Sequence, residues 1–539
     1  MKKAIVRKDS YFDSVFLMSL GQGVKSVPGV SDASVSMATP MNLGLLRDRG
    51  WSGPELEGAT PNDLLIAVDC ADEASADAAL AAAAALLARK APRAAAGAAP
   101  EPESLDAALE ELPGANLAVI SIPGAWAARE ARKALDRGLH VMLFSDNISL
   151  EDEIALKERG RALGLLVMGP DCGTAIIDGK PLCFANQVRR GGVGIVAASG
   201  TGLQEASCLV DRLGSGISQA IGTGGRDLKN EKVGGITMLM GIEALARDPG
   251  TRAILVISKP PAPAVAAKVV AALGAAGKPA VVHFLGLEPG AEAKAPPSVR
   301  FAPDLEAAAV LAASLARGGA PEGPAPGGAA FPRLGGPDAE EIESLARGEA
   351  RRLAPAQRWL RGYYTGGTLA DEALVLLHRQ TGRAFSNNQS DPAFILADPR
   401  RSVEHTIVDL GDDCFTVGRP HPMIDPSARN ERILAEADDP EVAVLLVDVV
   451  LGYGSHPDPA GALVPAIAEA RRAAAARGGH LPVVASVVGT GADFQGRRAQ
   501  VAKLEAEGCL VMPSNFRAAT LAARIAALAA ELTREGGAR

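Results

Sequence analysis

The sequence predicts a multidomain α/β protein built on parallel, doubly wound sheets. Its 539 residues exceed what one hydrophobic core usually organises, and 47% hydrophobic against 22% charged residues provide material for several cores. Short apolar runs rich in β-branched residues are each followed by glycine or proline and then by an amphipathic segment. That alternation is typical of βαβ units, and the continuously apolar runs fit strands buried on both faces. The runs read NLAVISIP, HVMLFSDN, LLVMGP, GIVAASG, AILVISKPP, AVVHFLG, HTIVDLGDD, VAVLLVDVVLGYG and LPVVASVVGTG.

The first part of the chain has a different pattern and predicts a small N-terminal α/β module over residues 1–95. KAIVRK, the helical stretch SYFDSVFLMSLGQGVKS and VSDASVSMA indicate a β-α-β arrangement. An alanine-rich segment at residues 78–104 passes into a Pro/Gly-containing linker, and residues 318–336 (GGAPEGPAPGGAAFPRLGG) predict an exposed tether. We therefore expect domains at 104–190, 191–317 and 351–539, with a linker at 318–350.

Composition excludes several classes of protein. The net charge of −8 is dispersed and no basic patch with interleaved aromatics occurs, which argues against nucleic acid as a ligand. No run of about 18 apolar residues predicts a membrane span, and the N-terminus lacks a signal-peptide core, so we expect a cytoplasmic protein. The six cysteines are scattered without a CxxC pair. We expect buried thiols and no metal site.

The strongest local signal is the segment from Gly194 to Glu205, GIVAASGTGLQE. A buried strand ends in small residues and a helix begins, so its free N–H groups favour an anion. We assign phosphate or substrate binding here to Ser199, Gly200, Thr201 and Gly202. A tight βα turn capped by serine or threonine would give the same pattern.

A second glycine-rich loop follows the next strand, and we assign it to substrate binding. It contains Gly222, Gly224, Gly225, Arg226 and Asp227. Three glycines within four residues indicate unusual torsions or close approach of a ligand. The Arg226 guanidinium could grip a carboxylate or phosphate, whereas a plain turn with a solvated Arg-Asp pair remains the alternative.

The C-terminal half offers a comparable arrangement. VLLVDVVLGYGSHPDPAG predicts a strand, a loop and a helix start, with Gly452, Gly454, Ser455 and His456 as candidate ligands of an anion. The preceding DLGDDCFTVGRPHPMID is dense in charge and contains Arg419 and His421. We expect a substrate loop there, with a solvated loop as the alternative.

Histidine spacing gives no metal pattern, and most histidines are expected to be structural. These are His140, His283, His378, His405 and His480. Cys172, in the GPDCGTA turn, has no partnered histidine in the sequence and is expected to be a buried structural thiol.

These motifs resemble succinyl-CoA synthetase. Residues 116–174 are similar to the CoA-binding domain of its α subunit, where GPNCPG matches residues 169–173. GIVAASGTGLQE and GISQAIGTGGRD resemble the next α-subunit domain, and residues 409 to about 528 resemble the carboxy-terminal domain of the β subunit. The resemblance covers perhaps 75% of the chain. It implies a Rossmann-like CoA-binding domain followed by two flavodoxin-like domains.

Two departures separate the chain from that family. The loop that should hold the phosphohistidine reads LEPGAEAKAPP, with no histidine, and His283 lies inside the preceding strand. No ATP-grasp domain is present. The resemblance places Glu205 on the family's glutamate contact to the phosphohistidine. We therefore expect no CoA or ATP cofactor unless the chain is a ligase.

The whole pattern is closer to the FdrA proteins, through matching stretches in the same order. They include ATPNDL, ALDRGLHVMLFSDNISLEDEIALK, MGPDCGTAI, ASGTGLQE, AIGTGGRDL, YYTGGTLA and DLGDDCFTVGRPHPMIDPSARN. The resemblance implies a subunit of an oxamate carbamoyltransferase, which interconverts oxalurate plus phosphate with oxamate plus carbamoyl phosphate in allantoin breakdown. It also implies two further subunits encoded nearby and an oligomeric assembly.

Under this reading Arg226 and Arg419 are candidates for the oxamate carboxylate, and Glu205 and His421 for orienting or proton-transfer roles. The catalytic cavity should lie between the middle and C-terminal domains, with one glycine loop from each. Two alternatives stay open: an acyl-CoA synthetase that uses a separate ATP-grasp chain, and a non-catalytic scaffold that binds CoA or a nucleotide.

Overall fold

The computed structural model describes residues 1–10, 12, 14–90, 102–286, 295–318, 334–416 and 419–537. Contacts divide the chain into two compact units, one of residues 1–108 with 417–420 and the other of residues 109–416 with 421–539. Within these described ranges, no helix combines the length and apolar character needed to cross a bilayer. The expected tether lies largely outside the described residues, as does most of the loop at residues 287–297.

The first unit is a three-stranded antiparallel sheet with helices on it. Its elements are β1 (Lys2–Arg7), α1 (Ser14–Lys25), β2 (Val30–Met37), α2 (Pro40–Asp48), α3 (Pro54–Glu57), β3 (Leu64–Cys70) and α4 (Glu73–Lys90). The strand order is β1-β3-β2, so the apolar β3 lies in the centre. Helices α1 and α4 pack on one face, and Trp51 belongs to a second apolar cluster with Leu65 and Ala67. A small N-terminal α/β module is thus confirmed.

The second unit starts with a Rossmann-like layer. A parallel sheet of order β4-β5-β6 carries the helices of this layer. The elements are α5 (Leu105–Glu111), at the boundary between the units along the chain, β4 (Leu117–Ile120), α6 (Gly124–Asp136), β5 (His140–Leu143), α7 (Leu150–Leu163) and β6 (Val167–Met168). Helix α7 begins where the Ser149 side chain accepts a hydrogen bond from Asp152 N–H, and it ends at Gly164, whose φ is 70°.

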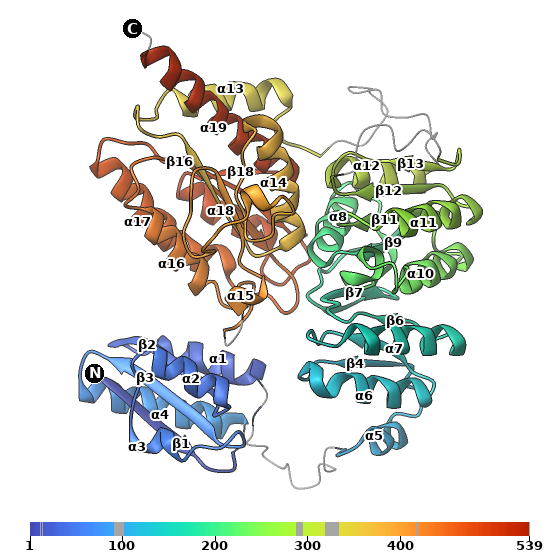
Figure 1. The fold of residues 1–539 in the computed structure, drawn as a ribbon, viewed down its shortest axis with the longest axis horizontal. Helices are drawn as coiled ribbons and strands as arrows, with labels where there is room; N and C mark the ends of the chain where they lie inside the picture. The colour runs from blue at the N-terminus through green and yellow to red at the C-terminus, as the bar shows by residue number, and fades with distance from the viewer. Residues whose placement is uncertain are drawn as a thin grey trace. The chain divides into compact units, whose positions relative to one another are not determined.

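The middle sheet has the order β13-β12-β11-β9-β10-β7-β8. Its elements are β7 (Thr174–Ile177), β8 (Lys180–Cys183), β9 (Arg190–Ala198), α8 (Gly200–Arg212), β10 (Ile217–Gly222), α9 (Arg226–Lys229), α10 (Ile236–Arg247), β11 (Ala253–Ser258), α11 (Pro263–Ala275), β12 (Ala280–Phe284), β13 (Val299–Phe301) and α12 (Leu305–Ala316). Strands β9 to β13 are parallel in the flavodoxin-like order, with α8 and α12 on one face and α10 and α11 on the other (Figure 1). The antiparallel hairpin β7-β8 lies in the range 104–190 expected for the preceding domain, but it extends the middle sheet.

The C-terminal sheet is parallel, with the order β15-β14-β16-β17-β18. Its elements are α13 (Ala339–Ala350), β14 (Trp359–Tyr364), α14 (Gly367–Thr381), the short 3₁₀ helix η2 (Pro392–Phe394), β15 (Thr406–Asp409), α15 (Asp413–Thr416), α16 (Ser427–Glu436), β16 (Val442–Val450), α17 (Pro459–Ala476), β17 (Val483–Val488), α18 (Arg497–Ala506), β18 (Leu510–Met512) and α19 (Asn515–Gly537). This is again the flavodoxin-like order, so the expected fold class is confirmed.

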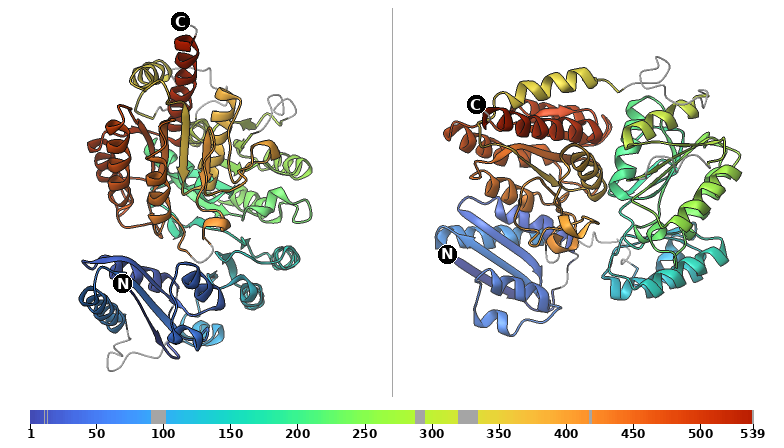
Figure 2. Two further views of the ribbon diagram at one scale, coloured as in Figure 1. Left: turned by 60° about the vertical axis from the view of Figure 1, so that its left-hand side comes forward. Right: turned by 45° about the horizontal axis from the view of Figure 1, so that its top comes forward.

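One apolar cluster runs from the middle sheet through α8, α12, α14 and α19 to the C-terminal sheet, and it joins the two flavodoxin-like layers. Helix α13 packs along α19 (Figure 2). Residues 339–350 fall within the expected linker 318–350, but they form a helix docked on α19. Asp338 and Glu341 form a capping box at its start, and Ile342, Ala346 and Ala350 are buried.

Candidate functional site

Helix α8 starts at the carboxyl end of β9, as the sequence predicted. Ser199 is its N-cap, and its Oγ accepts a hydrogen bond of 3.0 Å from Gly202 N–H. Strands β9 and β11 are neighbours although they are not consecutive among the parallel strands, so α8 begins at the switch point of the middle sheet. Ligands of open α/β sheets characteristically bind at such a point.

Helix α14 starts in the same way at the switch point between β14 and β16 of the C-terminal sheet. The turn before it is held by Asp448 on β16, which accepts hydrogen bonds from Thr365 N–H (2.8 Å) and Gly366 N–H (3.0 Å). Arg429 pairs with the same carboxylate at 3.1 Å, and both charged groups are buried. No side chain caps the helix itself.

These two helix starts meet. The Ser199 and Thr368 hydroxyls are 2.7 Å apart. A Cβ added at Gly366 would lie 2.8 Å from Thr201 Cγ2, so only glycine allows this approach. Among the described contacts, no acceptor is recorded for the N–H groups of residues 200, 201, 367 and 368. The arrangement provides hydroxyl groups and free N–H donors from two helices, which suits an oxyanion such as phosphate.

Charged side chains border the start of α14. Lys259, just after β11, pairs with Asp371 on α14 at 2.6 Å. A Cβ added at Gly367 would lie 2.5 Å from Asp409 Oδ2 and 3.3 Å from Lys259 Nζ. His421 Nε2 and Asp409 Oδ1 would lie 2.8 and 3.2 Å from a Cβ added at Gly411. The connections that follow β11 and β15, together with helix α14, thus bring a lysine, two aspartates and a histidine together.

Burial sets the protonation of this cluster. It raises the pKa of Asp409 to about 7, against the opposing charge of Lys259, and lowers the pKa of His421 to about 4. Burial alone would lower the pKa of Lys259, but Asp371 and Asp409 raise it overall. Near neutral pH the lysine is charged, the histidine is neutral and Asp409 occupies both protonation states.

The second predicted loop packs closely against residues 170–174, between the end of β6 and the start of β7. A Cβ at Gly222 would lie 2.4 Å from Thr174 O, and one at Gly224, whose φ is +81°, would lie 2.2 Å from Pro170 O. A Cβ at Gly225 meets nothing within 4 Å. These contacts explain the first two glycines without a ligand.

Two charged residues of that loop are engaged with α7 and α10. Arg226 pairs with Glu153 at 2.7 Å and donates to Ile148 O at 2.8 Å. Asp227 pairs with Lys157 at 2.8 Å and accepts a hydrogen bond from Met238 N–H at the start of α10. Among the described contacts Arg226 makes none with the two helix starts, although its charge and that of Lys259 both oppose the rise that burial causes in the pKa of Asp171. Arg419 belongs to the other compact unit.

The Gly452–Gly454 loop, predicted as the second half of the anion site, packs against residues 184–186 instead. Both glycines have positive φ, 106° and 79°, and an added Cβ would lie 2.5 Å from Ala185 O or 2.7 Å from Phe184. The loop N–H groups already donate hydrogen bonds to other parts of the protein: that of residue 452 to Gln495 Oε1, that of residue 453 to Ala185 O and that of residue 456 to Met423 O. Helix α17 is capped by Asp458. These donors are therefore not available to an anion.

The remaining predicted residues differ in their contacts: Glu205 and His456 accept hydrogen bonds from backbone N–H groups, whereas the buried Ser455 Oγ has no partner among the described residues. Glu205 accepts a hydrogen bond of 2.9 Å from Asn515 N–H at the start of α19. Ser455 is buried, and His456 Nδ1 accepts from Asp458 N–H at 3.0 Å. His283 is buried in β12 with Nδ1 3.0 Å from Ala302 O, as expected for a strand histidine. Cys172 is buried as expected, and burial raises the pKa of its thiol to about 12.

Sequence reasoning missed the residues that complete the site. They are Lys259, Thr365, Gly366, Gly367, Thr368, Asp371 and Asp448. The segment YYTGGTLA ends a strand with small residues before a helix, like GIVAASGTG, and this pattern could have identified α14. No local pattern distinguishes Lys259 or Asp448.

Comparison with known proteins places the fold in the CoA-ligase class. Residues 363–525 match the CoA-ligase family model, and residues 1–103 match that of the AllF heavy metal-associated domain. The succinate–CoA ligase α subunit of Aquifex aeolicus is 32% identical over 27% of this chain and 48% of its own length. An apo dinucleotide-forming acetyl-coenzyme A synthetase 1 from Ca. Korarchaeum cryptofilum aligns over 78% of this chain and 85% of its own, at 18% identity and a TM-score of 0.31.

A near full-length relative gives the family. The Escherichia coli (strain K12) protein YahF is 44% identical over 96% of this chain and 98% of its own length. The chain belongs to the family of YahF.

The N-terminal module does not fit a metal centre of the kind its matching family model is named for. Residues 1–103 contain a single cysteine, Cys70, and no histidine. Cys70 is buried, and burial raises the pKa of its thiol. Among the described residues, no three His, Cys, Asp or Glu side chains converge to hold an ion. A soft metal ion requires a set of thiolate or imidazole ligands, and the module offers a single buried thiol.

Proposed function

We propose that the chain is an FdrA-type subunit of an oxamate carbamoyltransferase, which interconverts oxalurate plus phosphate with oxamate plus carbamoyl phosphate in allantoin breakdown. The observation that supports this most is the meeting of two helix N-termini whose first N–H groups have no acceptor among the described contacts. Phosphate held by the free N–H groups and by the Ser199 and Thr368 hydroxyls can attack the carbamoyl carbon directly. Such a transfer needs a phosphate site and no phosphorylated carrier.

The proposal includes the setting of the reaction. The chain works in the cytoplasm, in an oligomer with two other subunits encoded nearby, and uses no CoA or ATP. The AllF-type match of residues 1–103 supports an assignment to allantoin metabolism.

An acyl-CoA synthetase remains the second candidate, because residues 363–525 match the CoA-ligase model and a Rossmann-like sheet precedes the site. That reaction would need an ATP-grasp partner and a phosphate carrier. His283 is a poor carrier, since it is 1% exposed inside a strand.

The test is a pair of assays on the chain purified with its genomic neighbours. Oxalurate and phosphate should yield carbamoyl phosphate, followed by ³¹P NMR, while ATP, CoA and carboxylic acids should yield no thioester. Ser199→Ala and Thr368→Val should each lower turnover about ten-fold, roughly 1.4 kcal/mol in the barrier. Thr381→Val, at the far end of α14, is the matched control. Formation of a thioester without any carbamoyl phosphate would show that the chain is an acyl-CoA synthetase and would refute the carbamoyltransferase proposal.

A further inference from the structure

The proposed reaction requires one proton to move. When HPO₄²⁻ attacks the carbamoyl carbon of oxalurate, a P–O–C bond forms and the C–N bond to the oxamate nitrogen breaks. The proton of the attacking phosphate must finish on that nitrogen, and atoms and charge then balance without another reactant. A side chain that accepts and returns a proton near neutral pH would serve this step in both directions.

Asp409 has the location for this transfer. Its Oδ2 lies 2.5 Å from the position of a Cβ at Gly367, so the carboxylate faces the first turn of α14. Oδ1 is occupied, because it accepts a hydrogen bond of 2.9 Å from Gly411 N–H. Among the described contacts none engages Oδ2, although the side chain is 93% buried (7% exposed). An unpartnered oxygen of a largely buried carboxylate therefore points to the end of α14 where an anion would bind.

The neighbouring groups are less suited to this role. His421 Nδ1 accepts from Met423 N–H at 3.2 Å, so the neutral ring carries its proton on Nε2, and burial keeps its pKa near 4. Glu205 is held by the start of α19. Lys259 keeps its charge through Asp371.

We propose that Asp409 is the proton-transfer residue of the carbamoyl transfer, and that Lys259, positioned by Asp371, is the cation that holds the anionic substrate beside it. This inference rests on the proposed function and deepens it, since it names residues that the resemblance did not assign. Asp371 acts through Lys259 and is a positioning residue.

The charges around Asp409 predict two opposite shifts in the pH–rate profile. The groups facing it are Lys259 after β11, Asp371 on α14, Asp412 in its own loop and His421 in the following loop. The base form starts the reaction, so turnover should rise with pH through the pKa of Asp409, about 7. The positive charge of Lys259 lowers this pKa and the negative charge of Asp371 raises it. Lys259→Gln should therefore move the rise to higher pH, and Asp371→Asn should move it to lower pH.

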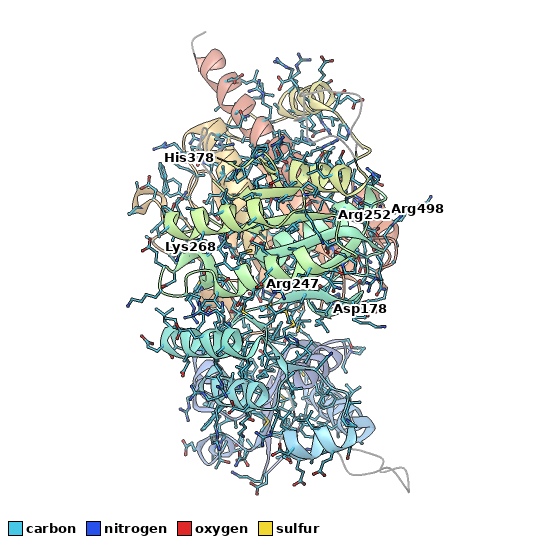
Figure 3. The ribbon with its side chains drawn as sticks, turned by 90° about the vertical axis from the view of Figure 1, so that its right-hand side faces the viewer. Asp178, Arg247, Arg252, Lys268, His378 and Arg498 are labelled. Carbon is cyan, nitrogen blue, oxygen red and sulfur yellow. The ribbon has the colours of Figure 1, made fainter. Side chains whose placement is uncertain are left out.

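The experiment uses the wild-type assembly and these variants, with turnover measured from pH 5 to 9 at a constant concentration of HPO₄²⁻, because the ionisation of phosphate itself falls in this range. Binding of inorganic phosphate is measured separately. Asp409→Asn should lower turnover by at least 100-fold, abolish the rise near pH 7 and change the phosphate Kd by less than three-fold. Lys259→Gln should weaken phosphate binding about ten-fold. The matched controls are Asp413→Asn, an exposed carboxylate in the same loop, and Lys268→Gln on α11 (Figure 3).

Gly367→Ala provides a second variant should Asp409→Asn fold poorly, because the added methyl group displaces the Asp409 carboxylate and should also abolish the rise. An active wild type with an unchanged profile in Asp409→Asn, or shifts of the same sign in the two ion-pair variants, overturns the inference alone. An assembly that forms no carbamoyl phosphate overturns the proposed function together with it.

Discussion

Glu372 should make the protein less stable as the pH rises through neutrality. Its Oε1 accepts a hydrogen bond from Leu305 N–H at 3.0 Å, and its Oε2 accepts one from Asn515 Nδ2 at 2.8 Å. These contacts and the hydrogen bond from Asn515 N–H to Glu205 form a buried polar cluster, the seam. No ion pair to either glutamate occurs among the described residues. Burial raises the pKa of Glu372 to about 8 and that of Glu205 to about 7.

The sign follows from proton linkage. A carboxyl whose folded pKa lies above its ordinary value of 4.5 binds protons more tightly when folded. Its stabilisation is complete below pH 4.5 and is lost as the pH rises through 8. Between these two values the free energy of unfolding falls by about 1.4 kcal/mol for each pH unit, so the loss relative to low pH is roughly 3 kcal/mol at pH 7 and up to about 5 kcal/mol above pH 8.

Glu372→Gln removes this titration but mismatches one hydrogen bond, which costs about 1–3 kcal/mol. The variant should therefore be less stable than wild type at pH 5 and equally or more stable at pH 8. Hydrogen exchange of the α14 and α19 amides, corrected for intrinsic rates, measures the local free energy of opening.

Glu349→Gln is the control of opposite sign, because the hydrogen bond with His480 lowers the pKa of Glu349 and its contribution is lost as the pH falls. Equal pH slopes for wild type and Glu372→Gln, or a wild type whose seam gains stability from pH 5 to 8, would refute the reasoning.

Three further substitutions or treatments probe the site. Gly366→Ala should lower stability by about 1–3 kcal/mol through overpacking against Thr201 and weaken phosphate binding at least ten-fold, whereas Gly225→Ala, in open space, should do neither; both are read by chemical denaturation and phosphate titration. Arg226→Ala should reduce stability because the ion pair with Glu153 is lost, while the phosphate affinity should change by less than two-fold. A ten-fold loss of phosphate affinity would indicate that Arg226 belongs to the binding site. Incubation with labelled ATP should leave no acid-labile phosphate on His283, and recovery of such label there by mass spectrometry would favour the ligase.

The sequence was sufficient for the parallel strands, because a strand buried on both faces needs a continuous apolar run. Residues 442–450, VAVLLVDVV, are all buried as predicted. The start of α8 was also predictable, since Ser199 caps it from within the same segment. Both features depend on neighbours along the chain.

The partner of α8 was not predictable from a local pattern. The loops after β14 and β16 both combine a buried strand, two glycines and a helix start. They differ in where their N–H groups donate: Gln495, 43 residues away, accepts from Gly452 N–H, whereas no described acceptor occupies the first N–H groups of α14. Only the tertiary structure reveals which loop has donors left for a ligand.

Helix α14 connects the site to the seam, because consecutive residues of its first two turns face different neighbours. Asp371 pairs with Lys259 after β11, while Glu372 accepts from the start of α12 and from Asn515 at the start of α19. Asp448 fixes the turn in front of the helix from β16. Buried polar contacts are strongly directional, and breaking one leaves an unpaired group that costs about 1–3 kcal/mol. Polar contacts from three sides therefore fix the position of the α14 start relative to its neighbours. The apolar cluster around the helix starts contributes to stability but does not determine that position.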